Sequence, residues 1–188
     1  MNSASTDVDT VTEPLSRLDS EPLREVEPAV LRSVMSRFAT GVTVLSVGGE
    51  HIHGMTANAF SSVSLDPPQV LCCVARSAVM HHAITASGTF AVSILGAGQE
   101  GLSQHFADKR RTLGPAQFDD VDWIAGAMTG APLLAGSLAW LECRLSSSHE
   151  SGDHSVFIGS VLDARLGSAA QGLLFFNGRY GHVSSQTG

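Results

Sequence analysis

One segment of the sequence alternates strictly in side-chain character over eight residues. Ala139, Leu141, Cys143 and Leu145 alternate with Trp140, Glu142, Arg144 and Ser146. Successive side chains of an extended strand point to opposite faces of a sheet, so this period of two predicts a long, half-buried strand.

Much of the remaining chain also has the character of short strands. Further strand-like runs lie at residues 42–47, 51–57, 60–65, 69–75, 90–95, 156–166, 173–176 and 180–183. Gly48-Gly49 predicts a hairpin turn between the first two runs, and Asp66-Pro67-Pro68 interrupts the pattern because proline cannot donate to a ladder. The run at 69–75 is apolar enough to predict a strand buried on both faces.

Three short helices are predicted among these strands. Leu31, Val34, Met35 and Phe38 follow helical spacing after Pro28, with Gly41 just past the end. Residues 79–87 lie between a capping Ser77 and a terminating Gly88, and residues 99–107 also have a helical pattern. Many strands with few short helices predict a mainly β domain, a closed antiparallel barrel with helical plugs, because closure removes exposed edges.

The net charge of −7 is concentrated near the N-terminus. Residues 1–27 hold seven acidic side chains against Arg17 and Arg24, a net of −5, which leaves −2 for the rest of the chain. This segment is rich in Ser, Thr, Asp, Glu and Pro and predicts a disordered or loosely attached arm, which could wrap a partner subunit. One domain is expected at 28–188, and the absence of a basic stripe argues against nucleic-acid binding.

The apolar runs are all much shorter than the roughly 20 residues that span a bilayer, so no membrane segment is expected. The N-terminus lacks the basic and then apolar regions of a secretory signal, which predicts a cytoplasmic protein. Cys72 and Cys73 are neighbours in a strand-like run, so we expect buried small side chains rather than a disulfide.

The most informative stretch for chemistry is residues 54–64, where small and hydroxyl side chains replace bulky apolar ones. Accessible backbone amides there could hold a planar heterocycle, and the Ser61 and Ser62 hydroxyls could bind a phosphate. The alternative is a serine-rich strand with its polar face in water.

Three other places carry candidate binding side chains. Arg76 and Ser77 lie at a strand end before a helix, which favours an anion, although a solvated arginine and a capping serine explain them equally. His154 follows a tight turn where it could orient a nicotinamide, or it could simply be exposed. Arg179 and Tyr180 combine an anion binder with a stacking ring, or are a surface arginine beside a barrel-closing aromatic.

Several other kinds of site find little support. Eight histidines suggest a metal, but no spacing of metal-binding type accompanies them. The sequence contains no Gly-x-Ser-x-Gly elbow, no Walker-type loop and no Gly-x-Gly-x-x-Gly fingerprint after a strand. Any nucleotide must therefore bind outside a Rossmann-type site.

Three stretches together carry a resemblance to a known family. They are Phe38-Ala39-Thr40-Gly41-Val42-Thr43-Val44, then Gly54-Met55-Thr56-Ala57-Asn58-Ala59-Phe60-Ser61-Ser62-Val63-Ser64-Leu65-Asp66-Pro67-Pro68, then Gly152-Asp153-His154 with Phe157-Ile158-Gly159. In this order they closely resemble the short flavin reductase family, over roughly residues 28–183.

The resemblance implies a split β-barrel that forms a homodimer, with FMN or FAD near the subunit interface and NADH or NADPH entering over the isoalloxazine. It also implies a partner, a flavin-dependent monooxygenase that receives the reduced flavin. The acidic arm before residue 28 departs from the family pattern, which puts partner contacts rather than flavin binding in doubt.

The resemblance also implies a set of site residues. The backbone of Met55, Thr56, Ala57 and Asn58 would meet the isoalloxazine edge, Ser61, Ser62, Arg76 and Ser77 would bind the phosphate, and Phe106 and Ala107 would pack beside the flavin. His154, Arg179 and Tyr180 would line the nicotinamide side, where His154 is the one candidate catalytic side chain.

Two other functions remain open at this point. One is a flavoprotein that keeps FMN tightly bound and acts directly on a substrate, and the other is a flavin- or haem-binding barrel without turnover. The sequence does not distinguish FMN from FAD or NADH from NADPH, since Arg179 could meet either a 2′-phosphate or a pyrophosphate.

Overall fold

The structure is a computed structural model that describes residues 25–183. Almost all of the acidic segment 1–27 therefore lies outside the described residues. Three α-helices are present in the described part: α1 (Pro28–Met35), α2 (Val79–Ser87) and α3 (Glu100–Ala107). Short 3₁₀ turns occur at η2 (Gly49–His51), η3 (Ala97–Gln99) and η4 (Pro115–Phe118).

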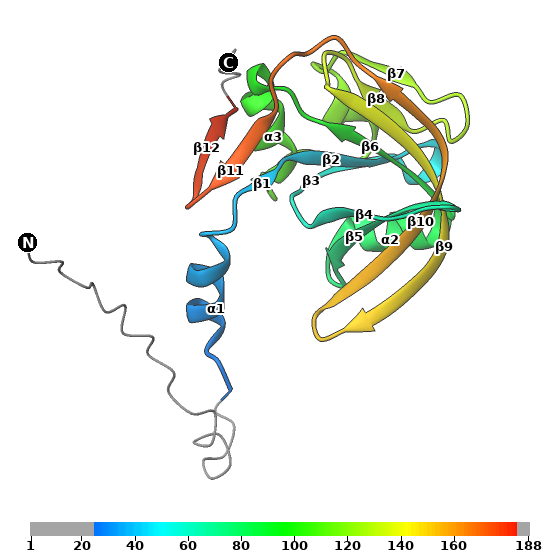
Figure 1. The fold of residues 1–188 in the computed structure, drawn as a ribbon. Helices are drawn as coiled ribbons and strands as arrows, with labels where there is room; N and C mark the ends of the chain where they lie inside the picture. The colour runs from blue at the N-terminus through cyan, green and yellow to red at the C-terminus, as the bar shows by residue number, and fades with distance from the viewer. Residues whose placement is uncertain (1–24, 184–188) are drawn as a thin grey trace, which may run out of the picture.

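Strands make up most of the rest of the described chain (Figure 1). They are β1 (Thr40–Gly41), β2 (Thr43–Val47), β3 (His53–Ala57), β4 (Phe60–Leu65), β5 (Pro68–Ala75), β6 (Thr89–Ile94), β7 (Trp123–Ala125), β8 (Pro132–Leu134), β9 (Ala139–Ser151), β10 (His154–Leu166), β11 (Leu173–Phe176) and β12 (Arg179–His182).

Seven strands form one antiparallel sheet in the order β3-β2-β6-β9-β10-β5-β4. The long β9 and β10 lie in its middle and curve, so that the β2–β3 end and the β4–β5 end face one another (Figure 1). No ladder joins β3 to β4 in the described chain, so the sheet is split rather than closed. The mainly β split-barrel class is confirmed, and the expected full closure is wrong.

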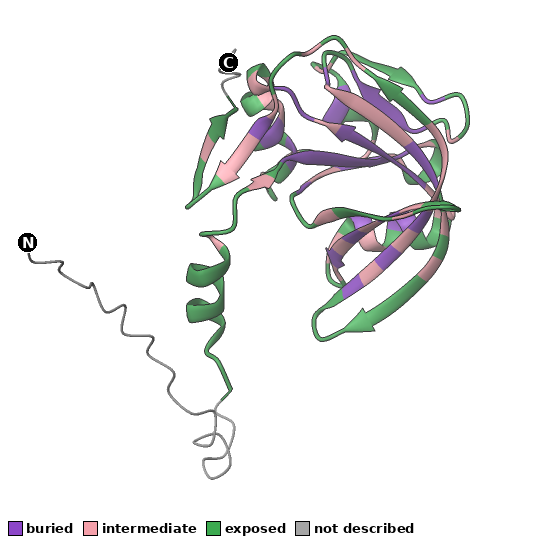
Figure 2. Ribbon diagram, viewed as in Figure 1, coloured by how far each residue is buried: buried purple, intermediate pink, exposed green. Residues whose placement is uncertain are grey.

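The main core lies inside the curve of this sheet. Leu45 of β2, Cys72 of β5 and Phe157 of β10 pack with Met80 and Ile84 of α2, and all five are almost completely buried. Figure 2 shows buried positions concentrated on β2 and β6. Helix α2 thus covers one end of the split barrel, and Gly88 ends it in the left-handed conformation as predicted.

A second cluster packs on the other side of β2. Phe106 of α3 and Phe118 of η4 join Val44 and Leu95 there, with the two phenyl centroids 5.2 Å apart. This cluster attaches α3 and the segment that follows it to the outer face of the β2–β3 end.

Several local expectations from the sequence differ from the structure. Strand β5 alternates between buried and partly exposed positions, because α2 covers only one of its faces. Ala78 rather than Ser77 is the N-cap of α2, and no side chain caps this helix. The Gly48-Gly49 turn is extended by η2, and the β7–β8 hairpin was not expected.

Helix α1 stands away from the curved sheet (Figure 1). None of its residues is buried, and Leu31, Val34 and Met35 are each more than half exposed (Figure 2). Within residues 25–183, no helix has the length and apolar character needed to cross a membrane.

Candidate functional site

A cavity of about 510 Å³ lies between β3, β5, the end of α3 and the tip of the β9–β10 hairpin. Residues 55–58, Ser77, Phe106, Ala107 and His154 line it, so the fold brings together residues from four separate parts of the sequence. The volume is within the range of sites for cofactors, about 300–1,000 Å³.

Strand β3 contributes its free edge to this cavity. The Gly54 N–H donates to Gln117 Oε1 at 2.8 Å and the Gly54 C=O accepts from Arg111, so both groups point away from β2. Main-chain groups of an antiparallel strand alternate in direction, which puts the N–H and C=O of Thr56 on the same edge. A donor and an acceptor on one edge match the amide-like edge of a planar heterocycle.

Helix α3 supplies the wall beside this edge. Thr56 Oγ1 donates to the Ser103 C=O at 2.7 Å, and Ser103 Oγ lies 2.8 Å from the Tyr180 hydroxyl. Phe106 is fully buried and lines the cavity together with the exposed Ala107. The hydroxyl chain fixes the distance between α3 and β3, and therefore the width of the cavity.

His154 lies at the tip of the β9–β10 hairpin, opposite Ala75 of β5. Its Nδ1 is 2.7 Å from Asp153 Oδ1, and this hydrogen bond lowers the pKa of Asp153. The pair leaves Nε2 as the ring nitrogen available to a ligand, since Nδ1 faces the carboxylate.

The remaining predicted residues do not line this cavity. Arg76 is half exposed and pairs with Glu150 at 3.2 Å. Ser61 and Ser62 lie exposed on β4, and Arg179 lies exposed on β12. Tyr180 meets Ser103 behind the cavity wall, so it touches the site through α3.

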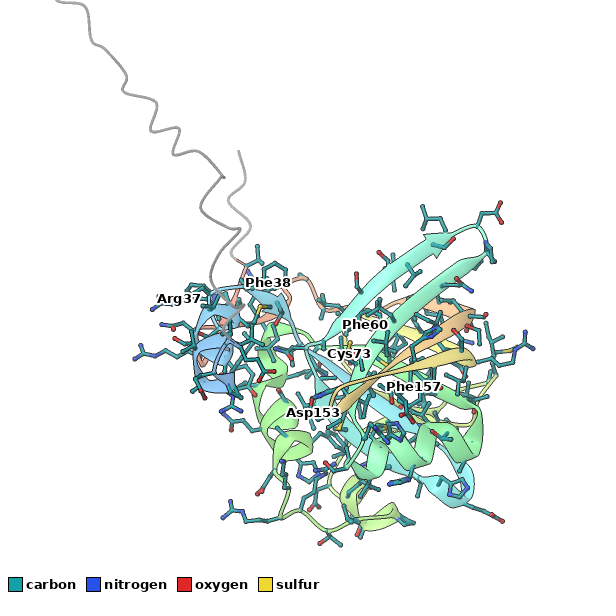
Figure 3. The ribbon with its side chains drawn as sticks, turned by 90° about the horizontal axis from the view of Figure 1, so that it is seen from below. Arg37, Phe38, Phe60, Cys73, Asp153 and Phe157 are labelled. Carbon is teal, nitrogen blue, oxygen red and sulfur yellow. The ribbon has the colours of Figure 1, made fainter. Side chains whose placement is uncertain are left out.

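A second cavity, of about 750 Å³, adjoins the first. Phe38, Phe60 and Ser61 line it, and it shares Asn58, Ala59 and Cys73 with the first cavity (Figure 3). Ser61 therefore lies in the adjoining cavity, which it lines together with Asn58.

Comparison with known proteins identifies the family. The description "Flavin reductase like domain" matches residues 35–184, which is most of the chain. The chain belongs to the flavin reductase-like family.

Two relatives and one solved structure show how near the likeness is. An NADH-dependent FAD reductase of Streptomyces globisporus is 50% identical over 169 residues, which cover 88% of this chain and 93% of that protein. A reductase subunit of a flavin-dependent monooxygenase of Mycobacterium tuberculosis is 35% identical, over 83% and 82% of the two chains. The flavin reductase component of a bacterial two-component tryptophan halogenase superposes with a TM-score of 0.82 at 44% identity, over 85% and 100% of the chains.

In this flavin reductase-like chain, sequence reasoning missed the basic side of the cavity. Lys109, Arg111 and His53 line it, and Arg111 lies 3.3 Å from His53 Nε2. Burial and then the charge of Arg111 lower the pKa of His53 to about 4. The run Lys109-Arg110-Arg111 directly after Phe106-Ala107 was the available signal.

Proposed function

We propose that this protein is an NADH- or NADPH-dependent flavin reductase that reduces FMN or FAD and releases it to another enzyme. The observation that carries this is the cavity beside the free edge of β3, built from residues 55–58, Phe106, Ala107 and His154 in a member of the flavin reductase-like family. The function agrees with the names of the relatives.

The chain's own residues would bind and orient rather than react. The nicotinamide donates a hydride and the flavin accepts it, so the protein needs no nucleophile. The edge of β3 at Thr56 would hold the flavin ring by main-chain hydrogen bonds, Phe106 and Ala107 would pack beside it, and His154 would direct the nicotinamide from the hairpin tip. Holding two rings at reacting distance lowers the entropic part of the barrier.

We also propose the remaining site roles that the resemblance implies. A phosphate that extends from Asn58 along the shared surface would approach Ser61 and Ser62, with Ser77 on the other side of the same cavity. Arg76 would have to exchange Glu150 for a phosphate. Arg179 and Tyr180 would act on the nicotinamide side, Tyr180 through Ser103.

A homodimer is part of this proposal, with the flavin site near the interface. Helix α1 has eight residues and buries none of them, whereas isolated helices below about 12 residues are marginal in water. Its exposed Leu31, Val34 and Met35, with Phe38 after it, form the apolar face that a second copy would cover.

The domain extent and the partner complete the proposal. Residues 28–188 would form the flavin-binding domain, with the acidic segment 1–27 as an arm outside it. The partner would be a flavin-dependent monooxygenase, in line with the reductase subunit among the relatives.

The test measures the oxidation of NADH and of NADPH as the loss of nicotinamide absorbance. Each is assayed with FMN, with FAD and with no flavin. Oxidation only with added flavin is expected, and it would identify both preferences. A protein that stays yellow on dialysis and turns over without added flavin would support the tightly bound flavoprotein instead. If no combination of nicotinamide and flavin leads to oxidation, the protein binds its ligand without turnover.

A further inference from the structure

The polar groups of Gly54 on the open edge of β3 are held by two side chains from the segment after α3. Gln117 Oε1 accepts the Gly54 N–H at 2.8 Å, and the Arg111 guanidinium donates to the Gly54 C=O. Edge strands ordinarily leave such groups to water or to another strand. Here one residue is fixed on both its donor and its acceptor side.

Aromatic side chains fill the remaining space around Gly54. A Cβ on this residue would lie 2.5 Å from Phe106 Cε1 and 3.0 Å from Phe118 Cζ. The two rings therefore pack directly on the Gly54 backbone, and only glycine fits there. The residue next along the chain is Met55, the first of the cavity-lining residues of β3.

The two side chains are themselves held by main-chain groups of their own segment. Arg111 donates to the Asp108 C=O at 2.8 Å, Gln117 Nε2 donates to the Gly114 C=O at 2.8 Å, and His105 Nε2 lies 2.8 Å from the Gln117 C=O. The segment 108–118, which follows α3, is thus held by its own hydrogen bonds and in turn binds β3.

Gln117 and Arg111 stand in different relations to the cavity. Gln117 is 2% exposed and does not line it, whereas Arg111 does. Any effect of Gln117 on a bound flavin is therefore indirect, through its contacts with Gly54 and His53 of β3.

We propose that Gln117 is a positioning residue for flavin, and that with Arg111 it holds Gly54 so that the edge of β3 at Thr56 stays in register with the ligand. This inference rests on the proposed flavin reductase function. Loss of the Gln117 contact leaves the buried Gly54 N–H without its partner, which lets this part of β3 shift and weakens flavin binding before it affects anything else.

The test compares three variants of the full chain by flavin fluorescence titration with FAD and by steady-state kinetics. Gln117→Leu is expected to raise the Kd for FAD about tenfold, with the KM for NADH within about twofold. Gln117→Glu keeps an oxygen for the Gly54 N–H but loses the donor to the Gly114 C=O, so it is expected to regain part of the affinity. Leu133→Val, at a buried position of β8, is the control for a general loss of stability and should leave the Kd for FAD unchanged.

An unchanged Kd for Gln117→Leu, with a fall in Tm like that of Leu133→Val, would overturn the positioning role. If Gln117→Leu does not fold, Gln117→Asn keeps the amide but is one methylene too short to reach Gly54, and the same specific loss of FAD affinity is expected. The wild type separates the two proposals: if it neither binds flavin nor oxidises NADH with flavin, the function fails, whereas an active wild type with unaffected variants removes only the role of Gln117.

Discussion

Two hydrogen-bond donors face the ring nitrogens of His53, and the neutral ring can accept from only one of them. Arg111 approaches its Nε2 at 3.3 Å and the Gln117 amide nitrogen approaches its Nδ1 at 3.4 Å, and the ring is 4% exposed. A proton added to the ring would face one of these donors and the charge of Arg111. Burial and this charge explain why the pKa of His53 falls from 6.5 to about 4.

The lowered pKa predicts a stability that depends on pH. Between pH 6.5 and 4 the unfolded chain takes up a proton at His53 that the native state does not, so the free energy of unfolding falls as the pH drops through this window. The loss is at most about 3 kcal/mol. Urea denaturation at several pH values should show it, and His53→Asn should flatten the profile. His51→Asn, at an exposed position, is the control, and an equal flattening there would contradict the assignment.

The position of His154 predicts that its loss affects NADH more than flavin. His154→Ala is expected to raise the KM for NADH about five- to tenfold while the Kd for flavin stays within about twofold, because the ring sits at the hairpin tip rather than at the β3 edge. Steady-state kinetics and fluorescence titration measure the two. His149→Ala on the same hairpin is exposed and should change neither. A larger effect on flavin than on NADH would reverse the assignment.

Among the elements, β10 shows how closely the split barrel is packed. Its register with β9 shifts between Ile158 and Gly159, and a Cβ on Gly159 would lie 2.6 Å from Phe90 Cζ and 3.0 Å from Cys143 Cβ. Phe90 is fully buried, so it has little room to move. Because Gly159 has no side chain at this register shift, Phe90 of β6 and Cys143 of β9 can pack directly against β10.

Gly159→Ala is therefore expected to destabilise the protein by about 1–3 kcal/mol. Gly101→Ala in α3 is the matched control, since a Cβ there meets nothing within 4 Å, and its stability should be unchanged or up to about 1 kcal/mol higher. Thermal or chemical denaturation of both variants makes the comparison. Equal effects at the two positions would show that the packing around Gly159 relaxes freely.

The elements differ in how well the sequence predicts them. Periodicity and turn residues identify α2, β4, β11 and the long β9–β10 hairpin, because these depend on neighbours in the chain. The three-residue strands β7 and β8 are too short to show a period, and closure of the barrel depends on how far the sheet curves. The basic side of the cavity, with Lys109 and Arg111, was missed because its position depends on long-range contacts. One of these joins Gln117 to Gly54, 63 residues away.

On the scale of the whole molecule, the apolar face of α1 is exposed, with Leu31, Val34 and Met35 each more than half accessible. Leu31→Asp should convert a dimer into a monomer, because it places a charge on that apolar face. Light scattering after size-exclusion chromatography measures the change. Ser33→Asp, on the opposite side of the same helix, should leave the dimer intact. A wild-type protein that elutes as a monomer at micromolar concentration would contradict the assembly.

The residues that line both cavities, Asn58, Ala59 and Cys73, would connect the proposed dimer to catalysis. A second copy seated against α1 and Phe38 would cover the second cavity, into which the flavin phosphate would extend from Asn58. Affinity for flavin and affinity between subunits would then be linked by mass action, each favouring the other. The activity of each polypeptide should consequently fall on dilution and recover when flavin is added in excess, so that the concentration of the reductase itself sets how much reduced flavin each molecule delivers.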